Sequence, residues 1–244
     1  MALPLEKSRI LEALQGGTID LQGQFVSGSN YTFLAQLEYQ DLRLPVVYKP
    51  VRGEQSLWDF PEHSLAKREA AAFVLSELLG WNLVPPTVFR RKGPLGRGSL
   101  QIFIQHNPEH HYFNFTPGER QRLRPFALFD LLANNADRKG GHLLLDADGD
   151  LWGIDHGVCF HVEDKLRTVI WDFAGEPLPA ELLPAVRWVA EELLQPESAG
   201  WKALAPLLRP SEIRAVGRRA QKLLEAGVFP HPTGDRRAYP WPPV

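Results

Sequence analysis

Three residues that can hold protons, metal ions or phosphates lie close together in the segment NNADRKGGHLLLDADGDLWGIDHG, residues 134–157. They are Asp137, His142 and Asp155, and the apolar runs HLLL and LWGI lie between them on either side of DADGD. The dipeptide Asp148-Gly149 is a strong hairpin-turn signal, so the two runs are expected to pair as antiparallel strands. Such a hairpin would gather the three side chains at one edge of the molecule.

Carboxylates that lie together repel one another, and a divalent cation removes that repulsion. Magnesium or manganese held in this way can in turn hold phosphate oxygens. The pattern is typical of phosphoryl transfer, in which one Asp positions the attacking hydroxyl and another Asp holds metal. A lysine from a distant part of the chain then holds the phosphates.

The chain before this segment has mainly strand signals. We expect a short helix at 8–14 with Ser8 as a possible cap, two strands joined at SGSN (27–30), and a third strand at 44–51. A long helix is predicted from Ser64 to Leu79, ended by Gly80. Two further strands, PPTVFRR and GSLQIFIQH, flank the turn KGPLGRG.

The chain after these strands has mainly helix signals. The stretch TPGERQRLRPFALFDLLANN predicts one helix, and amphipathic helices are expected at 179–195 and 210–227. This order indicates an α+β fold with a sheet-rich N-lobe and a mainly helical C-lobe. We divide the chain into an N-lobe (1–106), a C-lobe (107–229) and a proline-rich tail (230–244).

Two charged residues of the N-lobe join the candidate site by their order in the chain. Lys49 lies near the end of the third predicted strand, and Glu69 interrupts a partly apolar face of the long helix. A carboxylate on such a face needs a partner if it is buried. A small shift of the helix boundaries would instead turn Glu69 to solvent.

The motifs ADRKGGH and IDHG resemble the Asp-Arg-x-x-x-Asn catalytic loop and the Ile-Asp-Phe/His/Asn-Gly metal motif of the phosphatidylinositol 3- and 4-kinase-like family, within the protein-kinase-like fold. Asp137 and His142 keep the five-residue step between catalytic Asp and metal-binding Asn, and a hairpin between the two motifs is also the family arrangement. The resemblance covers roughly residues 20–195 and is sharpest over 134–157.

The resemblance implies a role for each matching residue. Asp137 would be the catalytic base or would orient the acceptor hydroxyl, with Arg138 balancing the negative charge beside it. Asp155 would be the main metal ligand, while Lys49 would bind the α- and β-phosphates, held by an ion pair with Glu69. The resemblance also implies a phosphate-covering loop made by Ser27, Gly28 and Ser29 and an interlobe hinge near the adenine made by Ile104, Gln105 and His106.

His142 stands where the family has Asn, which replaces an amide oxygen by an imidazole nitrogen. As a metal ligand it would favour manganese or zinc over magnesium. The expected cofactors are therefore ATP with Mg²⁺ or Mn²⁺. The alternative for His142 is a structural hydrogen bond within the loop.

Composition excludes several other classes of protein. The chain has 27 Lys and Arg residues and 29 Asp and Glu residues, which give a net charge of -2. This charge does not suit a nucleic-acid binder that works by bulk positive charge. The single cysteine, Cys159, excludes a disulfide framework. No apolar run reaches about 20 residues, so we expect no membrane span. The N-terminus does not resemble a signal peptide, and we expect a cytoplasmic protein.

We therefore expect an ATP-dependent phosphotransferase that moves the γ-phosphate to a hydroxyl of a protein or of a small polar metabolite. A phosphoinositide acceptor is less expected, because the segment after the metal motif offers only Lys165 and Arg167 as basic residues. One alternative is a nucleotide-binding pseudokinase with a scaffold or regulatory role, which the histidine at position 142 favours. The other is a metal-dependent phosphohydrolase that needs neither Lys49 nor Glu69.

Overall fold

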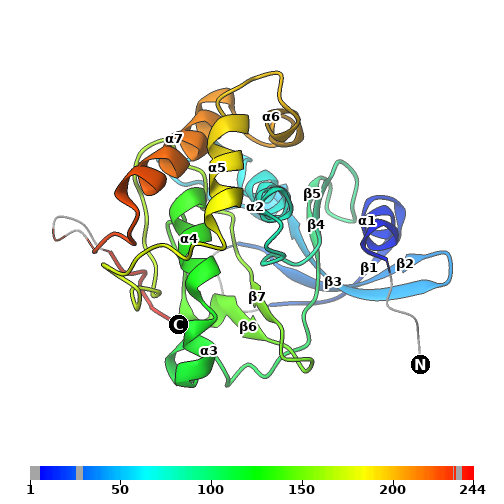
Figure 1. The fold of residues 1–244 in the computed structure, drawn as a ribbon. Coiled ribbons are helices and arrows are strands. Elements are labelled where there is room, and N and C mark those ends of the chain that lie inside the picture. The colour runs from blue at the N-terminus through cyan, green and yellow to red at the C-terminus, as the bar shows by residue number, and fades with distance from the viewer. Residues whose placement is uncertain (1–5, 26–29, 233, 235–237) are drawn as a thin grey trace.

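The computed structural model describes residues 6–25, 30–232, 234 and 238–244, and Figure 1 shows their arrangement. A five-stranded sheet forms the N-terminal part of the chain, and most of the helices follow it in the C-terminal part. The predicted α+β fold with a sheet-rich N-lobe and a helical C-lobe is confirmed. The exact division at residue 106 stays a prediction.

The sheet is antiparallel, with strand order β1-β2-β3-β5-β4. Its strands are β1 (Thr18–Gln24), β2 (Phe33–Tyr39), β3 (Leu42–Pro50), β4 (Thr87–Arg90) and β5 (Gly98–Ile102). Helix α1 (Lys7–Gly16) buries Ala13 and Leu14 in a core cluster with side chains of this sheet. All five predicted strands are present, and most of the turn at 27–30 lies outside the described residues.

Helix α2 (Leu65–Leu79) connects the sheet to the rest of the molecule. It ends as predicted at Gly80, whose φ of 68° is in the left-handed region that glycine adopts without strain. Its buried Leu75 and Leu79 belong to the core cluster that contains α4, α5 and α7. The helix is therefore packed against the helical part of the chain as well as against the sheet.

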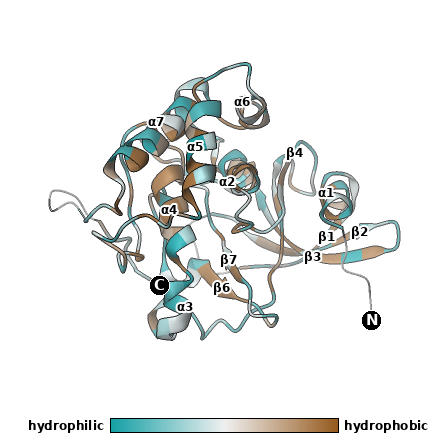
Figure 2. Ribbon diagram, viewed as in Figure 1, coloured by the Kyte–Doolittle hydropathy of each residue, from teal (hydrophilic) through white to brown (hydrophobic). Residues whose placement is uncertain are grey.

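The helical part surrounds this larger core, and Figure 2 shows hydrophobic residues concentrated along its inner elements. Its helices are α3 (Pro117–Gln121), α4 (Arg124–Ala133), α5 (Leu183–Glu192), α6 (Ala199–Leu204) and α7 (Pro210–Ala226). The described residues also include three short 3-10 turns. Turn η1 (Val51–Gly53) follows β3, while η2 (Tyr112–Asn114) and η3 (Gly140–His142) lie in the helical part.

Two predictions about helices were wrong in detail, and one helix was missed. The helix expected after Thr116 is two helices, α3 and α4, because Pro125 fits only the first turn of a helix and starts a new one. The short helix α6 was not predicted, because six residues are too few to show a helical period. Ser8 lies inside α1, whose N-cap is Glu6, without a capping side-chain hydrogen bond.

The predicted hairpin is confirmed as β6 (Leu143–Leu145) paired antiparallel with β7 (Leu151–Gly153). Gly149 has a φ of 84°, as its place in the turn requires. One carboxylate oxygen of Asp146 accepts the backbone N–H groups of Asp148 and Asp150, and the other accepts the Trp152 indole N–H. The carboxylate of Asp146 thus stabilises the turn of the hairpin.

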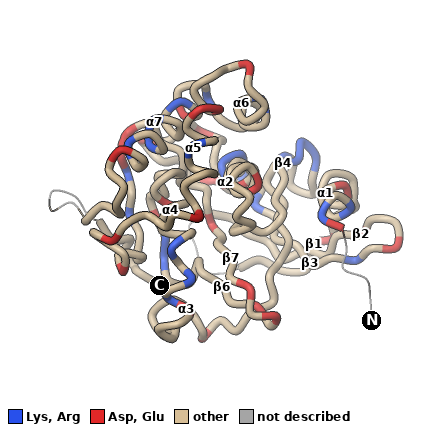
Figure 3. Tube along the Cα trace, in the orientation of Figure 1, with Lys and Arg blue, Asp and Glu red and all other residues tan. Residues whose placement is uncertain are grey.

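Charged residues of both signs are interspersed over the described elements, as Figure 3 shows. This distribution agrees with the small net charge of the chain. No helix among the described residues is long and apolar enough to cross a membrane.

Candidate active site

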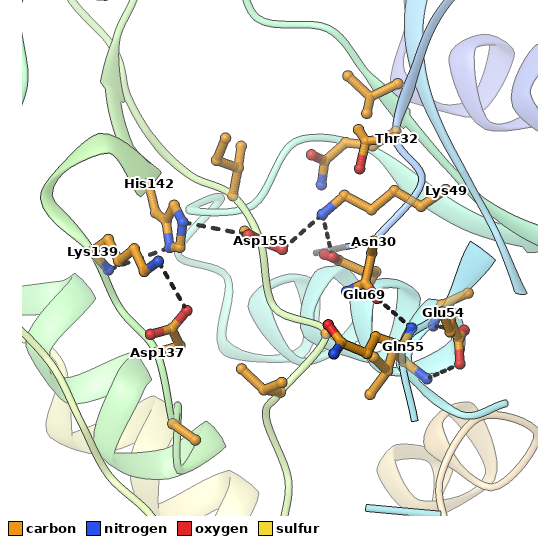
Figure 4. A pocket seen from close by; sticks show the side chains of 18 of the residues that line it. Asn30, Thr32, Lys49, Glu54, Gln55, Glu69, Asp137, Lys139, His142 and Asp155 are labelled. Carbon is orange, nitrogen blue, oxygen red and sulfur yellow. Dashed lines mark hydrogen bonds and ion pairs between the residues drawn. The ribbon is translucent and has the colours of Figure 1, made fainter. Parts of the chain in front are cut away.

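Lys49, Glu69 and Asp155 meet at one point, although they come from β3, α2 and the segment after β7 (Figure 4). The Lys49 ammonium donates a hydrogen bond to Glu69 Oε1 and another to Asp155 Oδ1 at 2.8 Å. The second oxygen of Glu69 accepts the backbone N–H of His156 at 2.9 Å. Glu69 is buried at 3% exposure, so it has the partner that a carboxylate on an apolar helix face requires.

Asp155 is placed by an unusual backbone conformation directly after the hairpin. Its φ of 59° lies in the left-handed region, which Asp and Asn tolerate better than most residues. The adjacent Lys49 holds the pKa of the Asp155 carboxyl well below its usual range. Although burial acts to lower the pKa of Lys49, Asp155 and Glu69 together raise it above the usual lysine value. The site therefore contains a charged lysine between two carboxylates.

Asp137 lies in the loop that follows α4. Asn134 ends that helix with a φ of 53°, and the side chain of Asn135 accepts the Asp137 N–H at 3.0 Å. Burial raises the pKa of the Asp137 carboxyl to about 6, with Lys139 opposing the shift and Asp155 adding to it. A carboxylate with such a pKa is suited to act as a base near neutral pH.

Arg138, the neighbour of Asp137, points its guanidinium into the protein interior. The side chain is fully buried, and it forms an ion pair with the buried Asp130 of α4 at 3.0 Å. It also donates to the carbonyl oxygens of Ile154 and His142, at 2.8 and 3.4 Å, and contacts His156 Nε2 at 2.7 Å. These contacts tie the loop to the end of the hairpin, so they support a structural role rather than charge balance beside Asp137.

His142 lies beside Asp155, with Nε2 at 3.3 Å from Asp155 Oδ2. Its other nitrogen, Nδ1, accepts the backbone N–H of Lys139 at 3.3 Å. Burial lowers the pKa of His142 to about 4, so the ring is neutral at physiological pH. Since Nδ1 is an acceptor, the single ring proton is on Nε2 and faces Asp155. The structural hydrogen bond considered from the sequence is therefore present.

A cavity of about 660 Å³ is lined by Lys49, Glu69, Asp137, His142 and Asp155. Its apolar walls include Val47, Ile102, Ile104, Leu144 and Ile154. Its polar lining includes Asp137, Lys139, Lys165 and Arg167, and the highly exposed Trp58 also lines it. The cavity thus combines apolar side chains, which suit a base, with charged side chains, which suit phosphates.

The predicted hinge and phosphate loop are placed only in part. Ile104 and His106 line the cavity, and the Ile104 carbonyl oxygen accepts the His106 Nδ1–H at 2.8 Å. Gln105 is exposed and is not among the described residues that line the cavity. Ser27, Gly28 and Ser29 lie outside the described residues. The adjacent Asn30 lines the cavity, and its side chain accepts the Gln55 N–H at 2.6 Å.

Lys139 is a site residue that the sequence analysis missed. Its ammonium lies 3.6 Å from Asp137 Oδ2 and faces the cavity (Figure 4). The available signal was its position two residues after Asp137, which places it in the same loop. Lys165 also lines the cavity, and its ammonium lies 5.1 Å from the centre of the Trp58 ring and 3.3 Å from Asp59 Oδ2.

The donor atoms fit a metal ion held jointly by protein and phosphates. No group of three or more His, Cys, Asp or Glu side chains that could hold a metal is found in the described part of the chain. Magnesium commonly binds through one or two carboxylates, substrate phosphates and water. Asp155, whose side chain is 49% exposed, can supply such a carboxylate to the cavity.

With this geometry in place, comparison with curated proteins is informative. Protein Rv2133c of Mycobacterium tuberculosis is 42% identical over an alignment of 264 positions. The alignment covers 94% of this chain and 93% of the relative. The chain belongs to the family of Protein Rv2133c. No family model matches the chain.

More distant relatives of this Rv2133c-family chain are plant kinases. Phosphatidylinositol 4-kinase gamma 4 of Oryza sativa subsp. japonica is 31% identical over 137 residues, covering 48% of this chain and 24% of the kinase. Phosphatidylinositol 4-kinase gamma 4 of Arabidopsis thaliana is 28% identical over 193 residues, covering 67% of this chain and 33% of the kinase. This chain therefore matches a third or less of the length of each plant kinase.

Solved structures place the Rv2133c-family chain in the protein-kinase-like fold. Hydra Fam20 with sugar aligns with a TM-score of 0.58 and 17% identity, covering 93% of this chain and 89% of that chain. The Golgi casein kinase with Mn/ADP bound aligns with a TM-score of 0.54 and 16% identity, covering 98% of this chain and 80% of that chain. The Helicobacter pylori proinflammatory kinase CtkA aligns with a TM-score of 0.52 and 10% identity, covering 88% of this chain and 94% of that chain. At these identities the similarity concerns the fold alone.

Proposed function

We propose that this chain is an ATP-dependent phosphotransferase that moves the γ-phosphate to a hydroxyl of a protein or a small polar metabolite. The observation that carries the proposal is the meeting of Lys49 with Glu69 and Asp155 beside a cavity that also contains Asp137. Three separate elements supply these charges, and a phosphohydrolase would need neither Lys49 nor Glu69.

In this proposal Lys49 binds the α- and β-phosphates, and Glu69 keeps its ammonium in place. Asp137, with its raised pKa, orients the acceptor hydroxyl and accepts its proton as the new phosphate ester forms. Lys139, close to Asp137, is placed to stabilise negative charge on the transferred phosphoryl group.

Asp155 would hold a divalent cation, magnesium or manganese, which would neutralise charge on the nucleotide phosphates. The Golgi casein kinase structure with Mn/ADP bound supports this choice of cofactor class. His142 as a second metal ligand stays a prediction. That role requires a free Nε2 lone pair, so the ring proton would have to move to Nδ1, which now accepts the Lys139 N–H.

The acceptor is proposed only as a hydroxyl compound. The names of similar proteins include a phosphatidylinositol kinase and a casein kinase, which differ in acceptor class. The sequence argument against a phosphoinositide rests on the few basic residues after the metal motif, and two of them, Lys165 and Arg167, do line the cavity. The phosphoinositide therefore belongs among the acceptors to be tested.

The proposal is tested by titrating ATP into the protein with magnesium and then with manganese, using Asp155→Ala as the control. Metal-dependent binding that the variant loses, followed by ADP release with an added acceptor, is the expected result. Binding without turnover would favour the pseudokinase alternative, which the His142 substitution supports. Absence of binding with both metals would contradict the kinase and the nucleotide-binding pseudokinase together.

A further inference from the structure

The end of the described chain lies across the loop that carries Asp137. The carbonyl oxygen of Pro243 accepts the backbone N–H of Gly140 at 2.8 Å. The carbonyl oxygen of Ala238 accepts the backbone N–H of Thr168 at 3.1 Å and the indole N–H of Trp171 at 3.2 Å. Figure 1 shows the C-terminus close to α3 and α4 in this view.

The hydrogen bond from Gly140 reaches the loop directly, and those from Thr168 and Trp171 reach it through the neighbouring backbone of 167–169. Gly140, three residues after Asp137, begins the turn η3, which ends at His142. In the same loop, Arg138 donates its N–H to the Arg167 carbonyl at 2.9 Å and accepts the Val169 N–H at 3.1 Å. The backbone of 167–169 therefore lies between the catalytic loop and the chain end.

The loop and the chain end are packed closely at Gly140. A Cβ atom at this position would lie 2.8 Å from Phe113 Cε2 and 3.5 Å from the Pro243 carbonyl oxygen. Phe113 belongs to η2, so the loop is held between that turn and residue 243. A loop enclosed on two sides has little freedom to change the position of Asp137.

We propose that residues 238–243 form a strap that positions the catalytic loop. The hydrogen bonds of the strap are accepted by the carbonyl oxygens of Ala238 and Pro243, while the side chain of Trp241 is 82% exposed. Its effect on rate rests on the proposed phosphotransferase function. Its effect on loop order does not, because loop order can be measured without any substrate.

Removal of residues 238–244 is the direct test. We expect the amides of Gly140 and Thr168 to exchange with solvent roughly tenfold faster or more, because their acceptors are gone. We expect turnover to fall roughly ten- to a hundredfold, since a small misplacement of the base is costly. The Kd for ATP should change less than about twofold, because Lys49 and Asp155 do not contact the strap.

Trp241→Ala is the matched control, because it alters the strap without removing either carbonyl acceptor. It should leave both amide exchange rates and turnover unchanged. The Gly153 amide, which donates to the Leu83 carbonyl at 2.7 Å, reports whether the truncated protein is folded. If the Gly153 amide also loses protection, the strap is tested instead with the conservative variant Trp171→Phe. This variant removes the indole N–H that donates to Ala238, so the Thr168 amide should exchange faster.

Two results separate failure of the strap from failure of the proposed function. If the truncated protein is folded, unchanged exchange at Gly140 and Thr168 would contradict the proposed strap. If it does not fold, unchanged exchange at Thr168 in Trp171→Phe would contradict it. Faster exchange in a protein without phosphotransfer in its full-length form would support the strap as a support of the loop and would contradict the kinase proposal alone.

Discussion

Lys49 lies 2.8 Å from Asp155 across 106 positions of sequence, and the same ammonium donates to Glu69. The two carboxylates thus share one cation before any ligand binds. A phosphate group that enters the cavity meets this lysine on the wall formed by β3.

Replacing Lys49 by Ala should weaken ATP binding and reduce phosphotransfer by about a hundredfold or more, because the preorganised cation is lost and two carboxylates repel the phosphates. Calorimetry and ADP release measure the two effects. Lys92→Ala, at an exposed turn residue, is the matched control. An unchanged rate of phosphate release in Lys49→Ala would instead favour the metal-dependent phosphohydrolase.

The pKa of about 6 for Asp137 predicts a pH dependence of the rate. The base must be deprotonated to accept the hydroxyl proton, so kcat/KM should rise as the pH increases through about 6 and then level off. Lys139 lowers this pKa, so Lys139→Ala should move the rise to higher pH. Asp137→Asn should lose the rise together with roughly a hundredfold or more of the rate.

The control for this pH profile is Lys222→Ala, an exposed position on α7. Its profile should coincide with that of the unaltered protein. A profile of Lys139→Ala that also coincides with it would contradict the assignment of the acidic limb to Asp137.

His142 distinguishes two ways of holding Asp155. With Nε2–H directed at Asp155, an Asn at this position retains an N–H donor, so His142→Asn should leave the ratio of manganese to magnesium affinity unchanged. His142→Leu removes the donor, and we expect metal-dependent ATP binding to weaken roughly tenfold. A shift of His142→Asn toward magnesium would show that the imidazole is itself a ligand.

The elements that position the site could largely be predicted, because they depend on local patterns. The five strands, the helix ended by Gly80 and the hairpin with its Asp-Gly turn follow from side-chain period and turn chemistry. The order of Lys49, Glu69, Asp137 and Asp155 indicated their convergence. The contacts of Lys49 with Glu69 and Asp155 are present, and Asp137 lines the same cavity, while the roles of these residues in catalysis stay predictions.

The remaining features depend on tertiary contacts that leave no local pattern. The buried pair of Arg138 with Asp130 joins two positions eight residues apart across the end of a helix. The contact of residue 243 with Gly140 depends on the path of the whole C-terminal part. The boundary between α3 and α4 could have been found from Pro125, since proline starts helices more readily than it continues them.

The pair of Arg138 and Asp130 makes the last prediction one of stability. Both side chains are fully buried, so Asp130→Ala would leave an uncompensated guanidinium in the interior. We expect a loss of about 3–5 kcal/mol in the free energy of unfolding, measured by urea denaturation. Asp148→Ala, in the exposed hairpin turn, should change that free energy by less than about 0.5 kcal/mol. A strong loss of rate in Asp130→Ala without loss of stability would instead return Arg138 to the role of a charge that acts beside Asp137.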